Sequence, residues 1–106
     1  MTRKEPVTIY GRRLREARDS YKFSQPELGV AIGLDAGGAG GRVSRYETGK
    51  HEVKHGLQEL FAKVLALPLT YFYIKDDEEA RSILEASRSD KPVKLKEAAK
   101  RKIKGN

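Results

Sequence analysis

Apolar residues recur along most of the chain at intervals of three and four positions, a spacing that places side chains on one face of a helix. The first such segment runs from about residue 9 to residue 22, and its apolar face comprises Tyr10, Leu14, Ala17 and Tyr21. Thr8 stands where its side chain can cap the first turn of that helix. No segment alternates apolar and polar positions as a half-buried strand does.

A capping box marks the start of a second, shorter helix at Ser24-Gln25-Pro26-Glu27. The spacing of Ser24 and Glu27 lets each side chain bond the backbone N–H of the other residue, and Pro26 suits a first turn. Gly33 predicts the end of this helix, because glycine readily adopts the positive φ found at helix ends.

Four of the eight residues from Leu34 to Gly41 are glycine. Each glycine in a helix interior costs about 1 kcal/mol relative to alanine. We therefore expect regular helix to resume only at Arg42, to continue to Glu47 and to end near Gly49.

The clearest apolar stripe follows at residues 57–65 and predicts a helix that ends before Pro68. A dense apolar and aromatic segment at residues 69–73 favours one short helical turn. The acidic residues at 76–79 suit the start of a last helix, which ends near Ser87.

These patterns predict an all-α domain of five to six short helices over residues 9–87, preceded by an N-terminal arm at residues 1–8. Residues 88–106 are rich in lysine and hold few large apolar side chains, so we expect a flexible basic tail. Within this tail, residues 94–104 can form a weak amphipathic helix on a partner or on DNA.

Composition and charge narrow the function. The chain has 106 residues and no cysteine, which excludes a disulfide scaffold, a thiol nucleophile and a cysteine-ligated zinc finger. It carries 22 Lys and Arg against 15 Asp and Glu, for a net charge of +7. The excess lies in residues 1–50 and 88–106, whereas residues 51–87 are net acidic. A basic face with a basic extension favours nucleic acid as the partner.

The sequence predicts a cytoplasmic protein without a membrane partner. No stretch reaches the roughly 18 apolar residues that a transmembrane helix needs. The N-terminal residues also lack the apolar run of a signal peptide.

Two segments, with Gly33 between them, carry a specific combination of residues: Ser24-Gln25-Pro26-Glu27-Leu28-Gly29 and Val43-Ser44-Arg45-Tyr46-Glu47-Thr48-Gly49-Lys50. Together they resemble the lambda-repressor-like helix-turn-helix family, also called the Cro/CI or XRE family, and the likeness runs from about Tyr10 to Tyr73. It implies a lambda-repressor-like bundle in which Gly29 lets the two motif helices approach closely. In such motifs the second helix lies in the major groove of DNA.

By this resemblance Arg45 is the leading base-contacting residue, since arginine can bond both O6 and N7 of guanine. Arg42 lies about one turn earlier and is a second candidate for base contact, and Ser44 is a weaker one. The alternative for Arg45 is a surface ion pair with a nearby acid such as Glu47.

The stretch from Gly33 to Val43 is about one helical turn longer than the usual spacing of the family. Gly40 and Gly41 consequently fall where other family members carry base-contacting side chains. Either the helix approaches DNA through its backbone, or its first turn becomes ordered only on DNA, and we favour the second.

The residues expected to contact the DNA backbone are Gln25, Thr48, Lys50 and Lys54. The Gln25 amide, at the head of the first motif helix, can hold a phosphate oxygen, and the alternative is a solvated first-turn residue. Other basic residues are candidates for the same face or for a solvated surface: Arg3 and Lys4 in the arm, and Arg12 and Arg13 in the first helix.

Nothing in the sequence favours a metal site, a cofactor or an enzyme. His51 and His55 stand four positions apart but have no third ligand, and Gly56 argues against a helix around them, so we expect loop residues. The glycine run follows no strand and is not a phosphate-binding loop, and no Ser/His/Asp arrangement has a supporting pattern.

The sequence therefore predicts a sequence-specific DNA-binding transcriptional regulator, a bacterial or phage-encoded repressor of the mobile-element type. We expect a homodimer on a two-fold operator, with Tyr71, Tyr73 and Ile83 as candidates for the dimer surface. Two alternatives stay open: an antitoxin-type module that binds a protein toxin as well as DNA, and a non-specific nucleic-acid binder driven by the tail.

Overall fold

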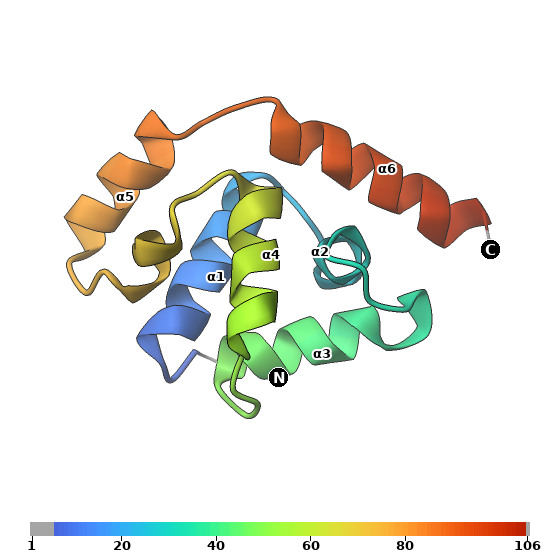
Figure 1. Ribbon diagram of the computed structural model, residues 1–106, viewed down its shortest axis with the longest axis horizontal. Helices are drawn as coiled ribbons and strands as arrows, with labels where there is room; N and C mark the ends of the chain where they lie inside the picture. Colours follow the sequence, from blue (N-terminus) through green and yellow to red (C-terminus); the bar gives the residue numbers. More distant parts are fainter. Residues whose placement is uncertain (1–5, 106) are drawn as a thin grey trace, which may run out of the picture.

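A computed structural model describes residues 6–105, so that Arg3 and Lys4 of the expected arm lie outside the described residues. Residues 6–105 form six α-helices and one short 3-10 helix, with no strand (Figure 1). The α-helices are α1 (Ile9–Ser20), α2 (Gln25–Ala31), α3 (Ala36–Thr48), α4 (His55–Leu65), α5 (Asp77–Ala86) and α6 (Lys91–Gly105), and the 3-10 helix is η1 (Leu69–Tyr73). The predicted all-α class is confirmed.

One hydrophobic core holds α1 to α5 and η1 together. Its centre consists of fully buried side chains from α1 to α4 and η1, namely Leu14, Leu28, Val43, Phe61, Leu65, Tyr71 and Phe72. Figure 1 shows α1 and α4 in the middle of the molecule, α3 along one edge, and α5 and α6 at opposite sides. The burial of Tyr71 corrects our expectation that it contributes to a dimer surface, because its ring is part of the core.

The helix starts follow the sequence closely. The Thr8 hydroxyl accepts a hydrogen bond from the Gly11 N–H at 2.9 Å and caps α1. Ser24 and Glu27 form both bonds of the capping box at the start of α2, at 3.1 and 2.8 Å. Gly33 follows α2 with a φ of +101°, as the sequence predicts. These contacts define the ends of α1 and α2 before any long-range packing is considered.

Two glycines allow α3 to lie against its neighbours at backbone distance. A Cβ atom built on Gly29 of α2 would stand 2.6 Å from the Ala39 Cβ of α3, so the predicted close approach of the motif helices is confirmed. A Cβ atom on Gly11 of α1 would overlap the carbonyl oxygen of Glu47. Larger residues at these two positions would push α3 away from α1 and α2.

The glycine-rich segment differs from our expectation, because α3 starts at Ala36 and not at Arg42. Our preference for a first turn that becomes ordered only on DNA is therefore wrong for the chain without DNA. The reason is packing: Ala39 has no exposed surface and lies against Gly29 and the cluster around Val30. Tertiary burial of one helix face outweighs the weak helical propensity of glycine.

The basic segment after residue 88 also differs from the flexible tail that we expected, because residues 91–105 form α6. Ala99 of α6 is buried, and Ile103 packs on the same cluster, which contains Val30 of α2 and Ala39 of α3. Few large apolar residues are needed, because small side chains allow α6 to approach α2 closely.

Polar contacts between the C-terminal end of α1 and residues 88–96 hold α6 in place. Arg88 donates to the Ser20 carbonyl at 2.8 Å, and Lys96 donates to the Tyr21 carbonyl at 3.0 Å. The Arg88 guanidinium also lies 4.2 Å from the centre of the Tyr21 ring. These carbonyls lack hydrogen-bond donors within α1, as the last carbonyls of a helix do, and the basic side chains supply the donors.

None of the helices within residues 6–105 has both the length and the apolar character that a membrane span requires.

We predict opposite effects of one substitution, glycine to alanine, at two positions of the motif. Gly38→Ala should raise the free energy of unfolding by about 0.5–1 kcal/mol, because its Cβ atom meets open space and alanine favours helix. Gly29→Ala should lower it by about 1–3 kcal/mol through overlap with Ala39. Urea unfolding measures both, and an unchanged stability in Gly29→Ala would contradict the close approach of α2 and α3.

Candidate nucleic-acid interface

The outward face of α3 carries positive charge and no negative charge. Its members are exposed or half-buried: Gly37, Gly38, Gly41, Ser44, Arg45 and Thr48. The single acidic residue of α3 is Glu47, whose side chain is completely buried. The first half of this face consists of glycine, so the helix backbone itself forms the surface there.

Glu47 is the centre of a buried polar cluster that joins α1, α2 and α3. Arg18 of α1 donates from Nε to Glu47 Oε2 at 2.5 Å and from Nη2 to Oε1 at 3.2 Å. Arg15 donates from Nε to Oε1 at 3.3 Å, and Gln25 of α2 donates from Nε2 to the same oxygen at 3.0 Å. A buried carboxylate is tolerated only with such partners, so Glu47 fixes the position of α3 against both neighbouring helices.

Arg45 does not pair with Glu47, and that alternative is wrong, because residues two positions apart do not face each other on a helix. The half-buried Arg45 side chain lies back along α3 over Gly41: a Cβ atom on Gly41 would stand 3.3 Å from Arg45 Nη1. Arg45 Nε is buried and has no hydrogen-bond partner within residues 6–105. Swinging the side chain outward therefore breaks no bond at Nε.

Arg42 and Thr48 are engaged in contacts within α3. Arg42 donates from Nη2 to the Tyr46 hydroxyl at 2.5 Å, and its guanidinium lies 5.6 Å from the centre of that ring. The Thr48 hydroxyl donates to the Ser44 carbonyl at 3.1 Å, which leaves only its oxygen lone pairs for other partners. The Ser44 side chain is half-buried on the outward face.

Gln25 occupies the head of α2, as the sequence predicts, and is half-buried. One N–H of its amide is used by Glu47, and an amide nitrogen carries two N–H groups. A phosphate oxygen near α2 can still receive the second one.

The two glycines expected to face DNA have different surroundings. Gly40 is half-buried, and a Cβ atom there would stand 2.9 Å from the ring of Pro26 in α2. Gly41 is exposed and adjoins the Arg45 guanidinium. Gly40 thus serves the packing of α2 on α3, whereas Gly41 belongs to the outward face.

Beyond the C-terminal end of α3, a groove of about 590 Å³ is lined by several basic side chains. Its lining consists of Arg42, Tyr46, Lys50, His51, Glu52, Lys54 and Leu57. Lys50 and Lys54 are both exposed, and Gly49 separates them from α3 in a left-handed conformation with a φ of +80°. The structure thus brings Lys50, Lys54 and Arg42 together at one end of α3.

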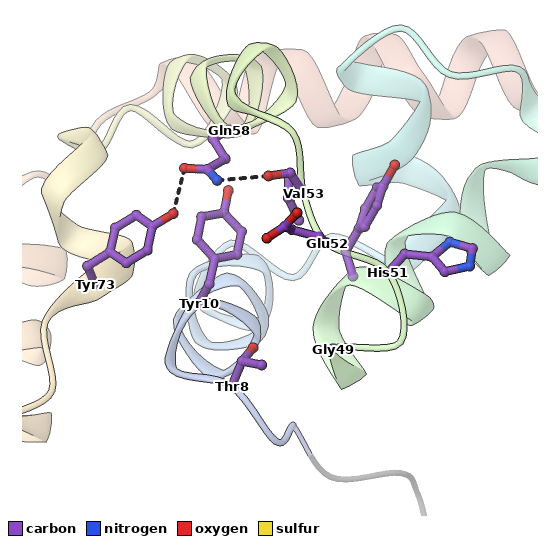
Figure 2. Close-up of a pocket in the computed structure, with 9 residues that line it drawn as sticks. Thr8, Tyr10, Gly49, His51, Glu52, Val53, Gln58 and Tyr73 are labelled. Carbon is purple, nitrogen blue, oxygen red and sulfur yellow. Dashed lines mark hydrogen bonds between the residues drawn. The ribbon is translucent and has the colours of Figure 1, made fainter.

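A smaller cavity of about 320 Å³ is lined by residues of the loop after α3 together with Tyr10, Gln58 and Tyr73 (Figure 2). The Tyr73 hydroxyl donates to Gln58 Oε1 at 2.8 Å, and Gln58 Nε2 donates to the Val53 carbonyl at 2.8 Å. Burial raises the pKa of the Tyr10 phenol far above its usual value, so this hydroxyl stays neutral. The bonds of Gln58 tie the loop after α3 to α4 and η1.

Arg13 lies outside the interface and corrects our expectation of a basic or solvated surface residue. Its side chain is completely buried and donates to the Ile74 carbonyl at 2.7 Å and to Asp77 at 2.9 Å. The hydrogen bond from Arg13 holds the pKa of the Asp77 carboxyl below its usual range. Arg12 is exposed and lies 3.3 Å from the same carboxylate.

Of the two histidines, only His51 lines the groove. His55 is the first residue of α4, and Gly56 lies in the first helical turn, so the expectation of loop residues was wrong for His55. His55 Nε2 stands 3.5 Å from Glu59 Oε2. Residues 6–105 contain no group of three or more side chains that could hold a metal ion.

The polar cluster around Glu47 was missed by the sequence reasoning, although its position gave a signal. Glu47 follows Val43 by four residues and therefore shares its inward face. Arg15 and Arg18 stand three positions apart on α1, which is the spacing that lets both reach one carboxylate.

A solved structure resembles this chain over most of its length. It is the crystal structure of the transcriptional regulator BswR, which is 33% identical in sequence, with a TM-score of 0.68. The alignment covers 91% of this chain and 93% of that one. This chain belongs to the same family as BswR. No family model matches the chain, and no curated protein matches it.

We predict that Glu47→Gln lowers the free energy of unfolding by about 3–5 kcal/mol, because it removes the carboxylate that the buried Arg18 and the half-buried Arg15 share. Urea unfolding measures the loss. The matched control is Glu85→Gln, at an exposed position of α5, which should change stability by less than about 0.5 kcal/mol. Equal stability of the two variants would contradict the role of Glu47 as the contact that fixes α3.

Proposed function

We propose that this chain is a sequence-specific DNA-binding transcriptional repressor that inserts α3 into the major groove of its operator. The observation that carries the proposal is the orientation of α3, which buries Glu47 and turns the Arg45 side of the helix to solvent. Membership of the BswR family supports a role in transcription. A repressor of this kind acts by occupying a promoter, in the cytoplasm of a bacterium.

Arg45 is the proposed base-contacting residue. It turns away from Gly41 and donates two hydrogen bonds to O6 and N7 of a guanine, which is the commonest specific contact in the major groove. Arg42 exchanges its bond to Tyr46 for a base or a phosphate, and Ser44 contributes a weaker contact. Sequence discrimination then rests on few side chains.

The glycines of α3 support a close approach of the helix backbone to DNA. Gly37, Gly38 and Gly41 are exposed, and the helix is formed without DNA, so binding costs no ordering of this segment. A helix that shows only glycine on the outward face of its first two turns can lie deeper in the groove than one with larger residues there. The sequence-dependent shape of the DNA groove then contributes to recognition where base contacts are absent.

Phosphate contacts supply most of the affinity in this proposal. Lys50 and Lys54 lie beyond one end of α3, and the free N–H of the Gln25 amide lies at the head of α2. Such contacts fix the position of the protein on the duplex and make binding salt-dependent.

A homodimer on a two-fold operator completes the proposal. Tyr73 of η1 is 55% exposed and Ile83 of α5 is half-buried, and neither belongs to the outward face of α3. A contact between two copies through these residues leaves both α3 helices free for the duplex.

We predict that Arg45→Ala weakens binding to the operator by about 1–3 kcal/mol and relaxes discrimination at one base pair. The operator is first obtained by enriching duplexes from a random pool with the wild-type chain. Titrations of the enriched and a random duplex then give the two affinities.

The matched control is Arg81→Ala, an exposed arginine of α5, which should leave both affinities unchanged. An equal loss on the enriched and the random duplex would show that Arg45 touches only phosphate. A wild-type chain that enriches no sequence would contradict sequence-specific binding altogether.

A further inference from the structure

The inner face of α6 is fully used in packing. Pro92 and Ala99 are buried, and Leu95 and Ile103 pack against the two hydrophobic clusters of the molecule. Lys96 is committed to the Tyr21 carbonyl. The side chains on the opposite face therefore have no part in holding α6 on the bundle.

The outer face of α6 is strongly basic. The helix has seven Lys and Arg residues and one acidic residue, Glu97, and its exposed cations on this face are Lys94, Lys100, Arg101 and Lys104. Glu97 stands 3.8 Å from Lys100 at the surface, and such an exposed pair contributes little. The single glutamate of α6 therefore does not cancel the positive charge of this face.

The C-terminal half of α6 lies beside α2, on the side of the molecule away from α5 (Figure 1). A groove of about 570 Å³ runs between them and is lined by Glu27, Glu97, Lys100, Arg101, Ile103 and Lys104. Glu27 lies in the first turn of α2, two positions after Gln25. The cations of α6 consequently border the helix that precedes α3.

We propose that Lys100, Arg101 and Lys104 bind the phosphate backbone of the same duplex that α3 enters, at sugars and phosphates outside the bases that α3 contacts. This inference rests on the proposed function and adds a second contact surface to it. The glycine half of α3 brings no cations of its own, and α6 supplies them on that side of the motif. Because α6 is already packed on α2, its cations are in place before DNA arrives, and binding does not have to order a tail.

The charge distribution favours DNA over a purely solubilising role for α6. Residues 88–106 have a net charge of +6, from eight basic and two acidic residues, whereas residues 51–87 are net acidic. One-sided positive charge next to a DNA-binding motif raises the local potential where a polyanion docks.

The test is the salt dependence of binding by a triple variant, Lys100→Gln, Arg101→Gln and Lys104→Gln, with the full chain. Each lost phosphate contact lowers the magnitude of the slope of log K against log salt concentration by about 0.9, so we expect a decrease of about two to three. The loss should be equal on the enriched and the random duplex, so discrimination is retained. Hydroxyl-radical footprints should lose protection at the flanks of the site and keep it at the centre.

The matched control removes three exposed cations elsewhere, in Lys63→Gln, Lys75→Gln and Arg81→Gln, and should keep the wild-type slope. A second variant, Lys100→Arg with Lys104→Arg, should also keep it, because the charges remain. Glutamine is a good helix former, and circular dichroism checks that α6 persists in the triple variant.

An unchanged slope in the triple variant would overturn the proposal and leave α6 as a solvated face or a surface for an acidic protein. A loss confined to the enriched duplex would also overturn it, since phosphate contacts do not distinguish sequences. The proposed function fails separately: Arg45→Ala would then lose no discrimination, whatever the slope of the α6 variant.

Discussion

The buried carboxylate of Glu47 determines which side of α3 the molecule shows to solvent. Two guanidinium groups from α1 and one neutral amide from α2 meet this carboxylate, and leaving the buried carboxylate without these partners would be costly. Residues two positions apart lie about 200° apart around a helix. Burying Glu47 therefore turns Arg45 away from the bundle. The close contact between Gly11 and the Glu47 backbone also holds α3 in this orientation.

This constraint explains how a helix with four glycines in its first six residues remains a helix. Its inward face is held by Ala39 against Gly29 and by Glu47 against α1, so packing compensates for propensity. The outward face of α3 is then not needed for packing against α1 or α2. In the proposed function it is used for close approach to DNA, with Arg45 as the one long side chain at its centre.

Local features were predictable, and long-range polar contacts were not. The capping box of Ser24 and Glu27 depends on residues three positions apart, so the sequence alone predicts it. The burial of Arg13 and Glu47 depends on partners that are 61 and 29 residues away along the chain. The composition of residues 88–106 predicted a flexible tail in place of α6. Composition alone does not show that Ala99 meets a complementary surface on α2. The base-contacting residues remain predictions drawn from resemblance and exposure.

In the proposed function, the outward face of α3 meets the duplex. The most direct measurement is a titration of the isotope-labelled chain with a duplex enriched from a random pool, followed by amide nuclear magnetic resonance. We expect the largest changes in chemical shift at the amides of Gly37, Gly38 and Gly41, and no change at the amides of α5. Changes concentrated on α5 or η1, with these glycine amides unaffected, would contradict it.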